Sequence, residues 1–202
     1  MILYLVASGK FSEEEFVSRI EFSLKGGVDW VQLRIKDIEF LKRILERTLI
    51  LKKDYNFKLI VNDFPHVALE FDADGVHIGD GDFEPEKARR LLKNKILGIS
   101  CYNKLERGKM AERIKADYAA FGALFPTLTK PGAVRVLPDT IIRAKKELKI
   151  PICVIGGINR NNIEDVISLH PDIIAISSSI FLAEDPSREA GFFKRKISND
   201  IL

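Results

Sequence analysis

Cysteine is scarce in this sequence, with Cys101 and Cys153 the two examples among 202 residues. A count of two excludes a disulfide framework and a cysteine-rich metal site. Both cysteines lie in apolar runs, so we expect them to be buried as small hydrophobic side chains. Histidine is almost as rare. No second histidine lies near His77, which argues against a histidine-based metal site. We expect His77 to make structural hydrogen bonds rather than to act as a base, and we expect His66 and His170 at the surface.

Long apolar runs and a strong net charge are also missing. No apolar run reaches the roughly 18 residues of a membrane-spanning helix, and residues 1–6 lack the basic segment of a signal peptide. The 32 Lys and Arg residues against 29 Asp and Glu residues leave a formal charge of +3, without a basic stripe that would indicate nucleic-acid binding. We therefore expect a soluble, cytoplasmic protein that binds neither nucleic acid nor membrane. The sequence leaves open whether it forms a homo-oligomer.

Two common nucleotide-binding fingerprints are absent as well. Neither GxGxxG nor GxxxxGK[ST] opens any expected helix. What the sequence does contain is ample material for a hydrophobic core, since 46% of its residues are hydrophobic. The length corresponds to about one domain, so we expect residues 1–202 to form a single domain.

Short β-branched strands alternate with amphipathic helices along the whole chain. The expected strands are residues 2–6, 28–34, 58–61, 75–78, 96–100, 118–122, 152–155 and 173–177. The expected helices are residues 12–25, 38–54, 66–71, 85–92, 104–114, 138–148, 160–169 and 186–196. Ser12 followed by Glu15 is a capping box that begins the first helix, and Gly26 with Gly27 ends it.

The order of these elements predicts an α/β fold. The strands are apolar throughout, which is typical of a parallel sheet covered on both faces. Eight strand–helix units in strict alternation fit a single, compact (β/α)8 TIM barrel better than an open doubly wound sheet, which remains the alternative. In a TIM barrel the active site lies at the C-terminal ends of the strands.

Polar and charged residues gather at those strand ends. They are Gln32, Arg34, Lys36, Asn62, Asp63, His77, Asp80, Asp82, Ser100, Thr127, Thr129, Lys130, Gly156, Gly157, Ser177, Ser178 and Ser179. Packing does not explain why seven apolar strands finish in such groups, so we interpret this face as a site. Each part also has a structural alternative: a solvated Arg-x-Lys pair, an Asn-Asp helix cap before Pro65, and a tight glycine turn.

The residue types at these strand ends suggest two phosphate sites. Arg34, Lys36 and Lys130 are cationic, and Asp63 and Asp82 follow two expected strands that we expect to be neighbours. Mg²⁺ binds one or two carboxylates together with phosphate oxygens, so this set predicts Mg²⁺ shared with a diphosphate. We expect Asp80, by contrast, to face solvent.

The second predicted phosphate site follows the last two strands. TIM barrels often bind a phosphate there through backbone N–H groups and a short helix. The turn at Gly156 and Gly157 and the serines from Ser177 onward fit this pattern.

Several motifs together resemble the thiamine-phosphate synthase and TenI family over nearly the whole chain. They are LYLV at 3–6, QLRIK at 32–36, VND at 61–63, ADGVHIG at 73–79, GIS at 98–100, ADY at 116–118, FPTLTK at 125–130 and IGGI at 155–158. The resemblance implies a TIM-barrel transferase of the alkyl/aryl type. Such an enzyme joins hydroxymethylpyrimidine diphosphate to thiazole phosphate and releases pyrophosphate, with the C–O bond breaking before the C–N bond forms.

The resemblance also implies a role for each matching residue. Asp63 and Asp82 would hold Mg²⁺, and Gln32 would orient the pyrimidine. The diphosphate would be bound by Arg34, Lys36, Asn62, Ser100 and Lys130, of which Arg34, Lys36, Ser100 and Lys130 would be catalytic. The thiazole phosphate would be bound by Thr127, Thr129, Gly157, Ser177 and Ser178.

Three features depart from the family pattern. Ala7-Ser8 stands where Thr-Asp is usual, Tyr102 stands where TenI-type tautomerases have a histidine for proton transfer, and the loop after Lys130 is short. Loss of that histidine counts against a tautomerase. The loop in the family would close over the substrates and exclude water from the reaction. A shorter loop therefore puts the rate of turnover in question, but not the binding site. A synthase is favoured, and a TenI-like thiazole phosphate tautomerase or a non-catalytic thiamine-phosphate-binding regulatory barrel remain the alternatives.

Overall fold

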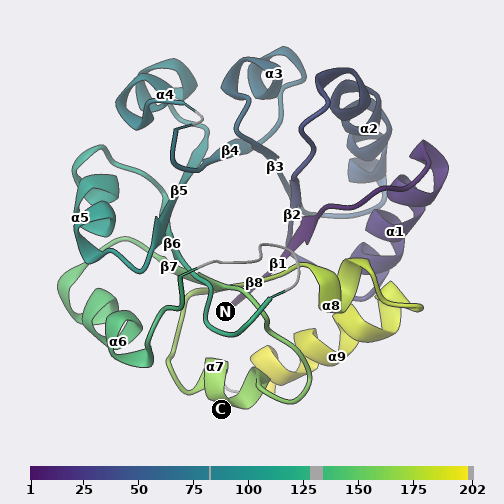
Figure 1. Cartoon of the computed structure of the whole chain (residues 1–202). Coiled ribbons are helices and arrows are strands. Elements are labelled where there is room, and N and C mark those ends of the chain that lie inside the picture. Colours follow the sequence, from purple (N-terminus) through teal and green to yellow (C-terminus); the bar gives the residue numbers. More distant parts are fainter. Residues whose placement is uncertain (82, 128–133, 200–202) are drawn as a thin grey trace.

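The strands form a closed parallel barrel. The computed structural model describes residues 1–81, 83–127 and 134–199, and within them eight strands pair in chain order from β1 to β8, with β8 returning to β1. The strands are β1 (Ile2–Ala7), β2 (Trp30–Leu33), β3 (Lys58–Asn62), β4 (Gly75–Ile78), β5 (Ile96–Tyr102), β6 (Tyr118–Phe121), β7 (Ile152–Ile155) and β8 (Ile173–Ile176). Closure confirms the predicted TIM barrel and excludes the open sheet (Figure 1).

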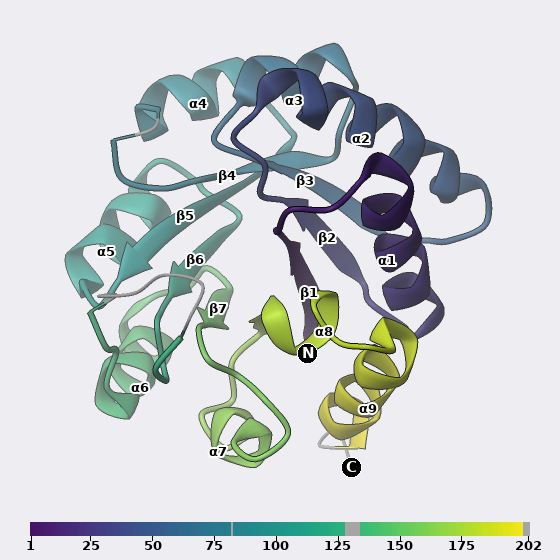
Figure 2. The same cartoon turned by 45° about the vertical axis from the view of Figure 1, so that its right-hand side comes forward.

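Helices surround the barrel on its outer side (Figures 1 and 2). They are α1 (Glu13–Lys25), α2 (Ile38–Ile50), α3 (Pro65–Glu70), α4 (Pro85–Leu92), α5 (Leu105–Arg113), α6 (Pro138–Glu147), α7 (Ile163–Ile167), α8 (Ser178–Phe181) and α9 (Pro186–Asn199), with a 3-10 turn at Leu51–Lys53. The predicted cap of the first helix is confirmed, because the Ser12 hydroxyl accepts the N–H of Glu15. No helix among the described residues is long and apolar enough to cross a membrane.

Two of the predicted helices are longer than the observed ones. The helix expected at 38–54 ends at Ile50 and tightens into the 3-10 turn, which leads into Asp54. The helix expected at 160–169 begins only at Ile163. There Asn159 and Asn162 accept backbone N–H groups in short-range turns, and such bonds compete with helix formation.

The period of two residues along each strand divides the apolar side chains between two cores. Leu3 and Leu5 of β1 face the helices and belong to the larger core, whereas Tyr4 and Val6 point into the barrel. Because both faces are covered, the strands are apolar throughout, as predicted from the sequence. The two cysteines are buried as expected, and burial raises the pKa of the Cys101 thiol to about 12.

Four aspartates form a repeating pattern at the N-terminal end of the barrel, and we call them the aspartate ring. Each directly precedes an even-numbered strand and accepts a backbone N–H from the preceding odd-numbered strand. The bonds run from Leu3 to Asp29 (2.8 Å), Leu59 to Asp74 (2.7 Å), Leu97 to Asp117 (2.8 Å) and Ile152 to Asp172 (2.7 Å).

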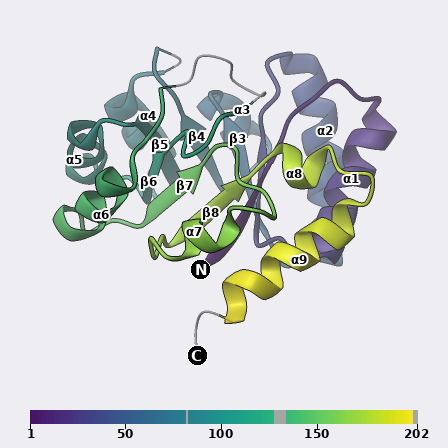
Figure 3. The ribbon, with the colours of Figure 1, turned by 60° about the horizontal axis from the view of Figure 1, so that its bottom comes forward.

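Each member of the aspartate ring is also paired with at least one basic side chain. The partners are Lys194 for Asp29, Lys52 and Lys58 for Asp74, Arg89 for Asp117 and Lys145 for Asp172. The four positions thus tie each odd-numbered strand to the next one. Figure 3, which brings α7, α8 and α9 forward, shows the chain beginning at this lower end of the barrel.

Candidate active site

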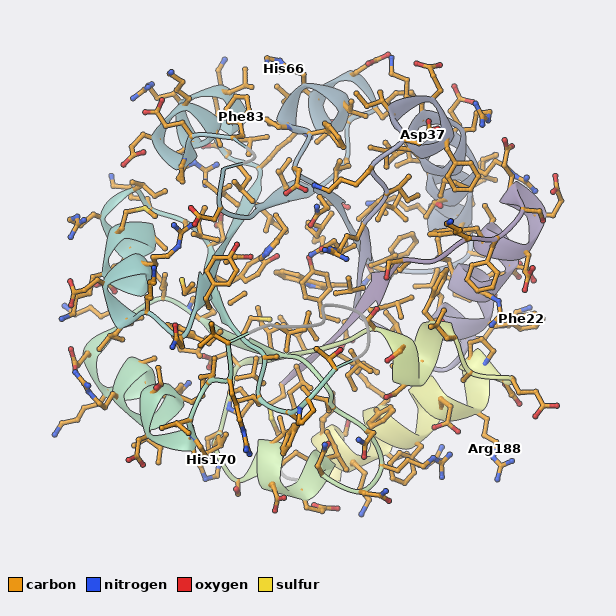
Figure 4. The ribbon with its side chains drawn as sticks, viewed as in Figure 1. Phe22, Asp37, His66, Phe83, His170 and Arg188 are labelled. Atoms are coloured by element: carbon orange, nitrogen blue, oxygen red, sulfur yellow. The ribbon has the colours of Figure 1, made fainter. Side chains whose placement is uncertain are left out.

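A pocket of about 570 Å³ opens inside the barrel at the C-terminal ends of the strands. This volume is within the usual range for a small-molecule site. Its floor is formed by residues of the inner core, including Tyr4, Tyr118 and Cys153. Figure 4 looks along the barrel and shows the labelled His66 and His170 outside it. Both histidines are exposed, as expected.

The pocket brings together ten of the residues predicted for the site. They are Gln32, Arg34, Lys36, Asn62, Asp63, Ser100, Thr127, Gly157, Ser177 and Ser178. The remaining three, Asp82, Thr129 and Lys130, lie outside the described residues. The pocket lining also includes residues that the sequence reasoning did not assign to the site, namely Tyr4, Tyr102, Asn103, Lys104 and Tyr118.

Asp63 presents its carboxylate to the pocket directly after β3. Its backbone is left-handed, with φ of 66°, a conformation that aspartate tolerates better than most residues. The backbone N–H of Asp63 donates to the carbonyl of His77 on the neighbouring strand (2.9 Å). The side chain is buried, and its Oδ2 accepts from the Lys36 ammonium at 2.5 Å and from the Asn62 amide. A fixed carboxylate thus lies beside a largely exposed cation.

A continuous chain of hydrogen bonds crosses the pocket floor. The Gln32 amide Nε2 donates to the Tyr4 hydroxyl (2.8 Å), which lies 3.0 Å from the Tyr118 hydroxyl. The Tyr118 hydroxyl is 2.9 Å from His77 Nδ1, and His77 Nε2 is 2.8 Å from the Ser100 hydroxyl. His77 therefore makes the structural hydrogen bonds expected of it, one at each ring nitrogen.

Tyr4 and Tyr118, the two tyrosines in this series of hydrogen bonds, are completely buried. Burial raises the pKa of both Tyr4 and Tyr118 well above the ordinary value, so both stay protonated. The ring of Tyr118 also stacks on the imidazole of His77, with centroids 5.6 Å apart and planes at 22°. Both hydroxyls therefore keep their protons and can donate hydrogen bonds.

A second cluster fixes the loop after β4. The Tyr102 hydroxyl accepts the backbone N–H of Asp80 (3.0 Å), and Arg107 donates to the Asp80 carboxylate (3.0 Å) and to the carbonyl of Ser100 (2.9 Å). The Asp80 side chain is 68% exposed, which confirms that it faces solvent. Tyr102, the residue in place of the TenI-type histidine, thus helps to hold this loop.

The turn after β7 requires glycine. Gly156 and Gly157 have φ of 107° and 66°, and a Cβ on Gly157 would lie 2.4 Å from the carbonyl oxygen of Pro126. Beside this turn, Ser178 begins the short helix α8, and the Ser179 hydroxyl donates to the carbonyl of Ile158 (2.7 Å). The sequence pattern did not reveal α8 because four residues are too few to show a period. The hydroxyl of Ser177 donates to the carbonyl of Val6 (2.8 Å). The first backbone N–H groups of a helix have no partner within it, so this end offers donors to an anion.

Sequence reasoning missed Tyr4 and Tyr118 as parts of the site. Each lies in an apolar strand, where an aromatic residue is usually core. The available signal was their position: Tyr4 alternates with Leu3 and Leu5, so it faces the barrel interior, where a hydroxyl needs a partner.

The chain has many relatives. The profile of a family described as thiamine monophosphate synthase matches residues 3–180. The thiamine-phosphate synthase of Clostridium acetobutylicum is 42% identical over 187 residues, which cover 90% of this chain and 88% of the relative. That of Nitrosomonas eutropha is 41% identical over 175 residues, covering 85% and 82%.

Solved structures show the same similarity as the sequences. Thiamine phosphate pyrophosphorylase from Pyrococcus furiosus superposes with a TM-score of 0.90 at 30% identity, over 100% of this chain and 97% of that one. A 3-hexulose-6-phosphate synthase from Salmonella typhimurium, with a TM-score of 0.74 at 23% identity over 100% of this chain and 98% of that one, shares the fold. The resemblance read from the sequence motifs is confirmed. This chain belongs to the thiamine monophosphate synthase family.

Proposed function

We propose that this protein is a thiamine-phosphate synthase, a transferase that joins the hydroxymethylpyrimidine group of its diphosphate to thiazole phosphate and releases pyrophosphate. Family membership supports this activity, and the observation that carries it is the composition of the pocket. Cations, a buried carboxylate and neutral donors surround one cavity that is large enough for both reactants.

The diphosphate is assigned to Arg34, Lys36, Asn62 and Ser100, which line the pocket, together with Lys130. As the C–O bond breaks, negative charge develops on the leaving diphosphate, and positive charge aimed at that group stabilises it. The C–N bond to the thiazole forms after this step. Holding both reactants in one cavity supplies the orientation, so the proposal needs no nucleophile from the protein.

The residues present fit a magnesium ion. Mg²⁺ prefers oxygen ligands and takes one or two carboxylates plus phosphate oxygens, and the Asp63 carboxylate lies in the pocket beside the cation that would bind the diphosphate. Asp63 and Asp82 are proposed as its ligands. When bound, Mg²⁺ would neutralise charge on the diphosphate and make it a better leaving group.

Thiazole phosphate is assigned to the opposite side of the pocket. Thr127, Gly157, Ser177 and Ser178 line that side, and Thr129 is proposed to join them. The Gly157 turn leaves no room for a side chain, and the first N–H groups of α8 are donors for a phosphate. Tyr102 stands where the TenI-type tautomerases have the histidine that transfers protons, which weighs against the tautomerase.

Product formation tests the proposal. Purified protein is mixed with hydroxymethylpyrimidine diphosphate and thiazole phosphate, with Mg²⁺ or with a chelator, and thiamine phosphate and pyrophosphate are measured. We expect equal amounts of both products with Mg²⁺ and neither with chelator. Absence of product while thiazole phosphate still binds would contradict the synthase and favour the regulatory barrel. Conversion of the thiazole phosphate alone to an isomer would favour the tautomerase.

A further inference from the structure

The hydrogen-bond chain on the pocket floor joins residues from five strands. It runs from Gln32 on β2 through Tyr4 on β1, Tyr118 on β6 and His77 on β4 to Ser100 on β5. Its contacts measure 2.8–3.0 Å, and both tyrosines are at most 1% exposed. Both ends, Gln32 and Ser100, line the pocket. The chain therefore connects two parts of the pocket through protein atoms.

If every hydroxyl proton is used within the hydrogen-bond chain, the donors and acceptors can be arranged in only two directions. Each hydroxyl has one proton to donate, and a neutral imidazole donates from one nitrogen and accepts at the other. If the Gln32 amide donates to Tyr4, then Tyr4 donates to Tyr118 and Tyr118 donates to His77 Nδ1. His77 then carries its proton on Nε2 and donates it to Ser100. In the reverse direction every donor becomes an acceptor, and Ser100 gives its own proton to His77.

We propose that this chain is polarised from Gln32 to Ser100, with His77 held as the Nε2–H tautomer, so that Ser100 enters the pocket as a hydrogen-bond donor and Gln32 as an acceptor through Oε1. Tyr4, Tyr118 and His77 are then positioning residues, because they act through the two groups at the ends. The assignment of Ser100 to the diphosphate and of Gln32 to the pyrimidine rests on the proposed function. The direction of the hydrogen bonds is a property of the protein alone.

The chemistry of the substrate favours this direction. A diphosphate has only hydrogen-bond acceptors, so it is bound by a Ser100 hydroxyl whose proton points into the pocket. A serine that donates its proton to His77 would instead turn its lone pairs toward the negative oxygens of the diphosphate. At the other end, the exocyclic amine of the pyrimidine is a donor, which suits the Gln32 carbonyl oxygen. Hydrogen bonds aligned in one direction also polarise one another and strengthen the terminal donor.

Nitrogen NMR on the imidazole rings tests the direction without any substrate. The protein carries three histidines, and replacing the exposed His66 and His170 with Gln leaves His77 as the single imidazole. The spectrum, recorded at a pH above the ordinary histidine pKa, distinguishes the two tautomers. We expect the proton on Nε2. A proton on Nδ1, or on both nitrogens, would overturn the proposal.

Two matched variants test the transmission of the effect. Tyr4→Phe and Tyr118→Phe each remove one hydroxyl from a fully buried ring. Tyr118→Phe takes away the donor that fixes His77 Nδ1, so we expect a mixture of tautomers and a kcat about tenfold lower, as for other residues that orient a functional group. In Tyr4→Phe, Tyr118 keeps its own proton for His77. We expect the tautomer to be retained, the KM for the pyrimidine diphosphate to rise several-fold, and any fall in kcat to be smaller than in Tyr118→Phe.

The outcomes separate this proposal from the proposed function. Loss of the Nε2–H tautomer in Tyr4→Phe but not in Tyr118→Phe, or equal falls in kcat in both folded variants, would overturn the role given to the chain. A wild-type protein with the Nε2–H tautomer but without synthase activity would refute the proposed function and leave the polarity standing. Circular dichroism establishes that each variant is folded.

Discussion

The two ends of the barrel use polar side chains differently. At the N-terminal end the aspartate ring repeats one arrangement four times, in which a carboxylate accepts a strand N–H and pairs with a basic side chain. At the C-terminal end the strands are followed by cations, a carboxylate, hydroxyl groups and glycines without a repeating arrangement, and these residues converge on one pocket. Repetition with local partners indicates a structural role, whereas unlike groups gathered around a cavity indicate chemistry.

The largest effect is expected from Asp63→Asn at the C-terminal end. Asparagine tolerates the left-handed backbone of this position as well as aspartate does, so the fold should persist, but the carboxylate beside Lys36 is lost. We expect kcat to fall by about 10²–10³-fold, as when one charge-stabilising group is removed from an active site. Steady-state kinetics and thermal denaturation measure both effects. Unchanged kcat would remove Asp63 from the proposed machinery.

The matching change at the N-terminal end of the barrel is Asp172→Ala in the aspartate ring, which is expected to affect stability and not catalysis. It leaves the N–H of Ile152 and the ammonium of Lys145 without their carboxylate. An unsatisfied buried donor costs about 1–3 kcal/mol, so we expect a loss of this order in the free energy of unfolding, measured with urea, and an unchanged kcat. Asp165→Ala on the exposed face of α7 is the control and should change stability by no more than about 0.5 kcal/mol.

Acid should weaken the aspartate ring at Asp74. Burial alone would raise the pKa of this carboxyl, but the N–H of Leu59 and the ammonium of Lys52 hold it below its ordinary value. A lowered pKa in the folded state stabilises the protein above the ordinary aspartate pKa of about 3.9, and this contribution disappears as pH falls through the lowered value. The difference in unfolding free energy between wild type and Asp74→Asn should therefore be constant near neutral pH and shrink below about pH 4. A difference that grows on acidification would contradict this assignment.

The smallest effect is expected from Ser12→Ala, a change at the C-terminal end of the barrel but outside the pocket. Ser12 caps α1 and lies after β1, so it shares the C-terminal end of the barrel with the pocket without lining it. We expect Ser12→Ala to lower the free energy of unfolding by about 1 kcal/mol and to leave kcat unchanged. A fall in kcat would show that location at this end matters more than convergence on the cavity.

The sequence predicted the barrel because its signals are local and repeated. Apolar strands separated by amphipathic helices indicate a parallel sheet covered on both faces, and eight such units in strict alternation favour a closed barrel over an open sheet. The aspartate ring escaped notice because the expected strand at 28–34 included Asp29, whereas β2 begins at Trp30, and because Asp117 was considered only as part of the ADY motif. The equivalence of the four positions appears only when the strands are paired.

The charged residues at the rim of the pocket were predicted from the sequence, but the hydrogen bonds on the pocket floor were not. Arg34, Lys36 and Asp63 are unusual at the ends of apolar strands, so a single sequence reveals them. The contacts that join Gln32 to Ser100 depend on Tyr4 and Tyr118, which are 114 positions apart in the chain. No local pattern encodes such a contact, because it arises only when β1 and β6 face each other across the barrel.

The most direct test of this account is to assay thiamine phosphate formation by wild type, Asp63→Asn and Asp172→Ala side by side, below the unfolding temperature of each. We predict that wild type and Asp172→Ala form product at equal rates and that Asp63→Asn is slower by about two orders of magnitude or more. No product from wild type, or equal rates from all three proteins, would contradict the assignment of chemistry to the C-terminal end of the barrel.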